Sequence, residues 1–109
     1  MICDRWDVVV VPFPFSERSG AKRRQALIIS RAAFNEHGHS LLAMITTRGH
    51  RPWPGDTDIE DREAARLDLP CTVRLKLFTL DNRLILNKIG RLADGDQGRV
   101  GDEIRVHAC

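Results

Sequence analysis

Long apolar runs and a targeting signal are both missing from this 109-residue sequence. The longest apolar runs, at residues 8–11 and 26–29, fall far short of the roughly 20 residues that span a bilayer. The N-terminus carries Asp4, Arg5 and Asp7 and lacks the charged-then-apolar order of a secretory signal. These absences predict a protein without a membrane-spanning helix and, by default, a cytoplasmic location.

Cysteine is also sparse. Cys3, Cys71 and Cys109 are odd in number, lie far apart and show none of the paired spacing that holds zinc. We therefore expect reduced thiols. His37 and His39 form a spaced pair, but no carboxylate or cysteine cluster nearby completes a metal site, and the turn at Gly38 explains both more simply. The sequence thus predicts neither a metal nor another cofactor.

The overall composition, with 42% hydrophobic and 29% charged residues, is that of an ordinary globular protein. The length predicts a single domain over residues 1–109, built around one core. The net charge is only +2, but its distribution is uneven: residues 56–70 hold six acids against two arginines, whereas the segments before and after are basic. Such a separation can attract polyanions to one face, although solvated surface charge explains it equally well.

The hydrophobic pattern predicts mainly β-structure, because short runs rich in β-branched residues recur between turn signals. Strands are expected at residues 7–13, 25–30, 41–46 and 72–77. A polar loop is expected at 16–23, and residues 83–92 are ambiguous, with a strand favoured over a helix. In the 72–77 run, polar and apolar residues alternate, which would place Arg74 and Lys76 on the solvent face and Leu77 on the buried one.

Helical structure is expected to be minor. Residues 31–36 tolerate a helix, and residues 48–70 should be mostly irregular, with Ile59 in a short strand and a helical turn at 60–67. Asp94 can cap a terminal helix that runs to about residue 107. Its apolar face would hold Val100, Ile104 and Ala108. Many short strands with one late helix favour a compact barrel over a βαβ fold.

Three ordered blocks of sequence resemble the MazF/PemK toxins of type II toxin–antitoxin systems. They are DVVVVPFPFSERSGAKRRQALIIS at 7–30, AMITTRG at 43–49 and TVRLKLFTLDNRLILNKIGRL at 72–92. Three blocks in order are far more specific than one short motif. The resemblance implies an SH3-like β-barrel of the CcdB/MazF type with a C-terminal α-helix. It also implies a metal-independent endoribonuclease that cuts single-stranded RNA at a short sequence, leaving a 2′,3′-cyclic phosphate and a 5′-hydroxyl.

The resemblance points to three catalytic residues. Arg24 would stabilise the charge that builds on the phosphoryl oxygens, because a guanidinium is always charged and presents a planar fork of donors. Thr46 would orient the phosphate through its hydroxyl, and Arg74 matches a family arginine proposed as an acid or phosphate ligand. Without the resemblance, a solvated arginine and a threonine chosen for strand fit would be the simpler interpretations.

Further residues are candidates for RNA binding: Lys22, Arg23, Thr47 and Lys76. For any one cation, a solvated surface charge is an equally good interpretation. His50 is the best-placed histidine for proton transfer, but we favour a surface-loop role. Trp53 and Phe78 are candidates for base stacking, but packing in the core or at an interface is the favoured interpretation, since aromatic residues are few.

The sequence departs from the family pattern at several positions. Gln25 replaces a proline after the arginine, which removes a fixed φ. Trp6 and Arg66 stand where the family has glycine. The strand after residue 72 looks one residue short, and it lacks the acidic residue that some members carry just after the arginine. A carboxylate general base is therefore not identifiable from the sequence, and its absence would leave a slow enzyme rather than none.

The family also implies partners: a homodimer, and an antitoxin whose acidic tail would cover the basic surface. Two alternative functions remain. One is a non-enzymatic gyrase poison like the CcdB toxins, although the chain end at 106–109 lacks the aromatic residue that such binding favours. The other is a degenerate member that only binds RNA or its antitoxin.

Overall fold

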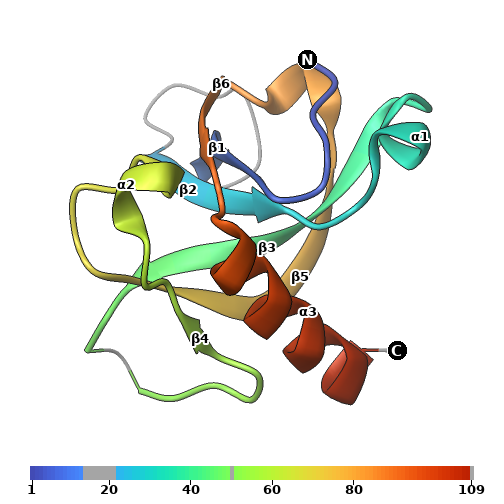
Figure 1. Cartoon of the computed structure of the whole chain (residues 1–109). Helices are drawn as coiled ribbons and strands as arrows, with labels where there is room; N and C mark the ends of the chain where they lie inside the picture. Colours follow the sequence, from blue (N-terminus) through green and yellow to red (C-terminus); the bar gives the residue numbers. More distant parts are fainter. Residues whose placement is uncertain (14–21, 50, 109) are drawn as a thin grey trace.

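The computed structural model describes residues 1–13, 22–49 and 51–108 (Figure 1). Its elements follow one another along the chain as β1 (Asp7–Phe13), β2 (Lys22–Ile28), α1 (Ala32–Asn35), β3 (His39–Thr47), β4 (Thr57–Asp58), α2 (Arg62–Ala65), β5 (Cys71–Asp81), the 3-10 turn η1 (Asn82–Leu84), β6 (Asn87–Arg91) and α3 (Asp94–Ala108).

The six strands form one sheet in the order β4-β5-β3-β2-β1-β6, and every neighbouring pair is antiparallel. The sheet curls into a half-barrel, and α3 packs against it (Figure 1). The predicted fold class, mainly β with a C-terminal helix, is confirmed. In the part of the chain described, the edge strands β4 and β6 are not paired with each other, so the sheet curls without closing.

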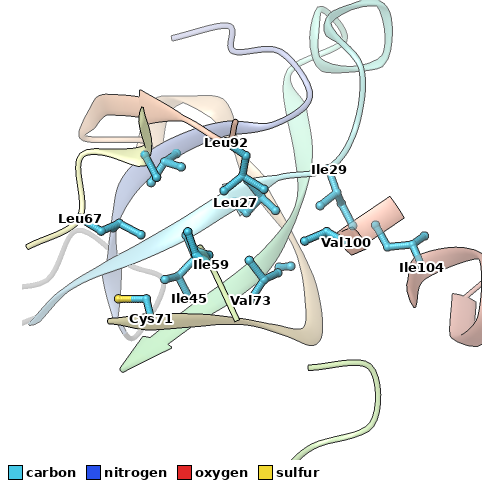
Figure 2. Close-up of a cluster of buried hydrophobic side chains, with 13 residues drawn as sticks. Leu27, Ile29, Ile45, Ile59, Leu67, Cys71, Val73, Leu92, Val100 and Ile104 are labelled. Carbon is cyan, nitrogen blue, oxygen red and sulfur yellow. The ribbon is translucent and has the colours of Figure 1, made fainter. Parts of the chain in front are cut away.

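The central strands are buried on both faces, as the run of valines in β1 predicts. Val8, Val9 and Val11 are fully buried. On β2, Leu27 belongs to one apolar cluster and its neighbours Ala26 and Ile28 belong to a second one, because successive side chains point to opposite faces of a strand. Figure 2 shows the first cluster, in which Val100 and Ile104 of α3 join side chains of the sheet.

The terminal helix differs from the prediction at both ends. The backbone N–H of Gln97 donates to the Ala93 carbonyl, so the first helical hydrogen bond starts before Asp94, which is a residue of the first turn and not the cap. Its negative charge still suits a helix N-terminus. Val100 and Ile104 are buried as expected, but Ala108 is exposed, so the apolar face ends one turn earlier.

Strand boundaries shift where the sequence is polar. Lys22 and Arg23, predicted to lie in a loop, belong to β2 and pair with Phe13 and Pro12 of β1. The backbone ladder continues past the last apolar residue because pairing needs no apolar side chains. The rest of that loop, with its bend at Gly20, and His50 and Cys109 lie outside the described residues. In the ambiguous stretch, the favoured strand is confirmed as β6, but residues 83 and 84 form part of η1.

An irregularity in the β3–β5 pairing changes which side chains face the solvent. Ala43 pairs with Leu77, but the next residue, Met44, pairs with Arg74, so Leu75 and Lys76 form a bulge. The predicted alternation therefore fails at Leu77, which is 39% exposed. Bulges re-aim side chains and are over-represented beside functional sites.

Two departures from the family pattern coincide with an unusual backbone conformation. Trp6 has φ of 77° and Arg66 has φ of 58°, and these are the non-glycine residues with positive φ in the described ranges. Glycine adopts this conformation without strain, which explains its use at both positions. Arg66 ends α2 as a left-handed C-cap, and the Trp6 ring lies close to Gly101 of α3.

Gly90 provides a test of the packing between β6 and α2. A Cβ on Gly90 would lie 2.6 Å from the Ala65 carbonyl carbon, whereas a Cβ on Gly98 of α3 would meet no atom within 4 Å. We expect Gly90→Ala to destabilise the fold by about 2 kcal/mol through this clash. Gly98→Ala should instead stabilise it by about 1 kcal/mol, because alanine favours a helix. Urea denaturation measures both, and equal effects would contradict the packing.

Candidate nucleic-acid interface

A large cavity on the described surface lies where β2 and β3 part. Their pairing ends at Ala26 opposite Met44, and extending the same register by two residues would set Arg24 opposite Thr46. The bulged part of β5 forms the next part of the wall, so residues far apart in the sequence line one cavity of about 910 Å³. We call this cavity the β2–β3–β5 pocket.

Six of the seven predicted site residues line this pocket: Arg23, Arg24, Thr46, Thr47, Arg74 and Lys76. The seventh, Lys22, is exposed and pairs with Phe13 at the far end of the β1–β2 ladder, outside the lining. The structure therefore brings the predicted catalytic trio together across three strands. Their chemical roles stay predictions.

The pocket is cationic and partly apolar. Four cationic side chains line it, and among the described lining residues none is acidic. Val10, Phe13, Met44, Leu77 and Phe78 supply the apolar part. The Arg24 guanidinium carbon lies 5.7 Å from the centre of the Phe13 ring. A surface with cations for phosphate and flat apolar groups for bases suits single-stranded nucleic acid.

Arg74 is fixed by a carboxylate that the sequence did not reveal. Its Nε donates to Asp56 Oδ1 at 3.2 Å, and its Nη2 donates to Asp56 Oδ2 at 3.0 Å and to the Arg51 carbonyl at 2.7 Å. Burial alone would raise the pKa of Asp56, but the hydrogen bonds from Arg74 and from the Trp53 backbone outweigh burial and hold the pKa below its ordinary value. The hydrogen bond to Asp56 also raises the pKa of Arg74, which therefore stays protonated.

Asp56 could have been noticed from its place in a turn. Trp53, Pro54, Gly55 and Asp56 form a tight turn closed by a 3.1 Å hydrogen bond from the Asp56 N–H to the Trp53 carbonyl. Gly55 has φ of 82°, and proline followed by a positive-φ glycine is typical of a type II turn. The sequence shows the turn residues but not the strand against which the turn folds.

Trp53 is not a core residue, and that part of the expectation is wrong. It is 41% exposed, and the Lys76 ammonium lies 4.5 Å from the centre of its ring. Phe78, the other aromatic candidate, lines the β2–β3–β5 pocket and also packs against the second core cluster.

Beside this pocket lies a smaller cavity that shares Thr47 and Arg74 with it. Asp58 stands at its edge, where it accepts a 2.7 Å hydrogen bond from the Thr72 hydroxyl and pairs with Arg48 at 3.6 Å. The two cavities therefore adjoin each other at Thr47 and Arg74.

The other sequence candidates do not gather into a site. Among the residues placed by the structure, no three metal-ligating side chains converge, and the His37–His39 pair holds no metal cluster. Cys3 and Cys71 are free and buried, and burial raises the pKa of both thiols, which disfavours reactivity. In the described ranges, no helix has the length and apolar character that crossing a bilayer requires.

Comparison with known proteins identifies the family. The sequence profile of the PemK-like, MazF-like toxins of type II toxin–antitoxin systems matches residues 4–107. The chain belongs to this toxin family. None of the curated protein sequences compared with it matches significantly.

Solved structures share the fold of this MazF-family toxin. An endoribonuclease from a mycobacterial species, in complex with its cognate antitoxin, superposes with a TM-score of 0.74 at 18% identity, covering 95% of this chain and 92% of the other. The MazE–MazF complex of Deinococcus radiodurans (form III) superposes with a TM-score of 0.73 at 19% identity, covering 97% of this chain and 96% of the other. The Mycobacterium tuberculosis toxin MazF-mt6 superposes with a TM-score of 0.71 at 19% identity, covering 90% of this chain and 91% of the other. At such identities the similarity concerns the fold.

The Asp56–Arg74 ion pair has a predictable pH dependence. Because the pKa of Asp56 is lowered on folding, its contribution to stability is complete above the unfolded pKa of about 3.9 and is lost as pH falls through the folded value. We expect Asp56→Asn to cost about 2 kcal/mol at pH 7. Its difference from the unsubstituted protein should shrink at pH values well below 4.

Thermal or urea denaturation across this pH range measures the effect. Asp102→Asn is the matched control, because Asp102 pairs with Arg105 on the exposed surface of α3 and should contribute little. A pH-independent deficit in Asp56→Asn would contradict the ion pair as its cause.

Proposed function

We propose that this MazF-family toxin is an endoribonuclease that cleaves single-stranded RNA without a metal ion, leaving a 2′,3′-cyclic phosphate and a 5′-hydroxyl. The observation that carries the proposal is that Arg24 and Thr46 line one cationic pocket, although they lie more than twenty positions apart in the chain. The endoribonuclease activity named for a structural neighbour of the same fold supports it.

The proposed reaction is an intramolecular transfer at phosphorus. The 2′-hydroxyl attacks the adjacent phosphorus, a bond from O2′ to phosphorus forms, and the bond from phosphorus to O5′ breaks. The 2′-hydroxyl gives up a proton, and the leaving O5′ takes one. Negative charge builds on the non-bridging oxygens, where the Arg24 guanidinium would stabilise it and the Thr46 hydroxyl would donate a hydrogen bond.

Arg74 is better suited to hold phosphate than to supply a proton. Its hydrogen bond to Asp56 raises its pKa, so it keeps its proton and its charge at all ordinary pH values. The same ion pair fixes the guanidinium at the pocket wall. The proposed role of Arg74 is therefore a fixed phosphate ligand.

The remaining cations and Thr47 would hold RNA on either side of the cut. Arg23, Thr47 and Lys76 line the pocket, so they would contact nucleotides next to the scissile phosphate. Lys22 lies outside the lining and would contact the backbone only where the strand leaves the pocket. Binding through these cations should weaken steeply with salt.

Two protein partners belong to the same proposal. Structural neighbours were solved with an antitoxin, which supports a cognate antitoxin for this chain. An antitoxin segment rich in acidic residues would complement the cations of the pocket. By family analogy the toxin would act as a homodimer in the cytoplasm.

The test is cleavage of a long single-stranded RNA in EDTA. We expect cleavage to persist, with 2′,3′-cyclic phosphate at the mapped ends. Arg24→Ala should slow it about 100- to 1,000-fold, as loss of one transition-state donor does. Thr46→Val should slow it less, since it removes a neutral donor.

The control variant is Arg83→Ala, because Arg83 pairs with Asp81 at 2.8 Å and does not line the pocket. It should cleave at the unsubstituted rate. Equal cleavage by Arg24→Ala would point to a contaminating nuclease, and loss of all cleavage in EDTA would contradict the metal-independent mechanism.

A further inference from the structure

The exposure of Trp53 is not explained by the fold. A tryptophan has much to gain from burial, yet this side chain stays 41% exposed. Two other exposed apolar side chains, Phe13 and Leu77, line the β2–β3–β5 pocket, and the Lys76 ammonium links Trp53 to the same place. These three exposed apolar side chains therefore lie in the pocket or beside it.

The backbone that carries Trp53 is held firmly. The Trp53 N–H donates to Asp56 Oδ2 at 3.0 Å, and the Asp56 N–H closes the turn on the Trp53 carbonyl at 3.1 Å. The carboxylate of Asp56 is in turn clamped by Arg74 of β5. Arg74 also holds the Arg51 carbonyl, so the turn is fastened to the sheet on both sides of Trp53.

Close packing under the turn adds to this restraint. A Cβ on Gly55 would lie 2.5 Å from Leu75 Cδ1 and 3.1 Å from His107 Cδ2, so the backbone rests directly on the bulge of β5 and on the end of α3. A flat side chain on a fixed backbone loses little entropy when a ligand settles on it.

The position of Lys76 indicates which ring face a ligand would use. Its ammonium lies 4.5 Å from the ring centre, and the same side chain lines the pocket, so the face that it covers adjoins the pocket. A cation over an exposed ring is held weakly, whereas a stacked base is held more strongly and brings its own phosphate. An arriving nucleotide can therefore displace the ammonium, which then pairs with the phosphate.

We propose that Trp53 is a stacking platform for an RNA base next to the scissile phosphate, that Lys76 takes the phosphate of that nucleotide, and that Asp56 is the positioning residue that holds the platform. The proposal rests on the proposed function, because it assumes that single-stranded RNA occupies the pocket. It names a base contact that the pocket lining itself does not include.

Fluorescence gives a direct readout of stacking. The sequence has two tryptophans, Trp6 and Trp53, so Trp53→Phe leaves as reporter only Trp6, which does not line the pocket. The probes are ten-nucleotide 2′-deoxy oligonucleotides of adenine, cytosine or thymine, which lack the 2′-hydroxyl and cannot be cleaved by the proposed reaction. We expect them to quench the unsubstituted protein and not Trp53→Phe.

The affinities of the variants for these oligonucleotides distinguish the contribution of stacking from that of charge. Trp53→Ala should weaken binding about tenfold, and Trp53→Phe by much less, because phenylalanine still stacks. The salt dependence of binding should be unchanged in Trp53→Ala, whereas Lys76→Ala should lower its slope by about one. An abasic ten-mer should bind the unsubstituted protein and Trp53→Ala equally, because it has no base to stack.

Phe34→Ala is the matched control, since Phe34 is an exposed aromatic residue on α1. It should bind and quench like the unsubstituted protein. A tenfold loss that persists with the abasic ten-mer, or an unchanged affinity in Trp53→Ala, would overturn the platform. So would quenching by an acidic ten-residue peptide with none by the oligonucleotides.

The two proposals fail in different ways. If the unsubstituted protein quenches on binding the oligonucleotides but does not cleave RNA, the stacking role of Trp53 stands and the proposed endoribonuclease activity is contradicted. If cleavage depends on Arg24 but not on Trp53, at both saturating and limiting RNA concentrations, only the stacking role of Trp53 is contradicted.

Discussion

β3 is hydrogen-bonded to β5 along its whole length, from His39 opposite Asp81 to Thr47 opposite Cys71. This ladder joins the two longest strands and buries Ala43, Ile45 and Val73 in the first core cluster. Midway along, the pairing shifts and two residues of β5 are left over. The shift lies at the site, because Arg74, Lys76 and Leu77, on either side of it and within it, all line the β2–β3–β5 pocket.

The ion pair between Arg74 and Asp56 links the sheet to the long segment before it. It gives Arg74 a partner at the pocket wall and ties the turn at Trp53 to the sheet, in addition to the packing beneath Gly55. The carboxylate beside Arg74 comes from the turn before β5 and not from β5 itself.

Two features of the structure are unfavourable for folding: left-handed backbone at two non-glycine residues and exposed apolar side chains at the pocket. Trp6 and Arg66 adopt a left-handed conformation without being glycine, which is tolerated where the surrounding structure determines it. At Trp6 the ring packs near Gly101 of α3. The exposed faces of Phe13 and Leu77 at the pocket likewise gain no burial energy on folding.

The sequence by itself determined the class of the fold and pointed to the cationic and hydroxyl side chains that line the pocket. Four adjacent valines and the short apolar runs around residues 26 and 42 favour buried strands, and the three family blocks pointed to Arg24, Thr46 and Arg74. The apolar runs are local patterns along one strand, whereas the three site residues are what the resemblance to the family implies.

Only the tertiary structure decided the pairing of Asp56 with Arg74, the exposure of Leu77 and the place of Trp53 beside Lys76. Each depends on how segments distant in sequence pair or pack against one another. The alternation in β5 predicted a buried Leu77, because the sequence of a strand does not show where a bulge will form. Residue types set which contacts can form, and the register decides which of them do.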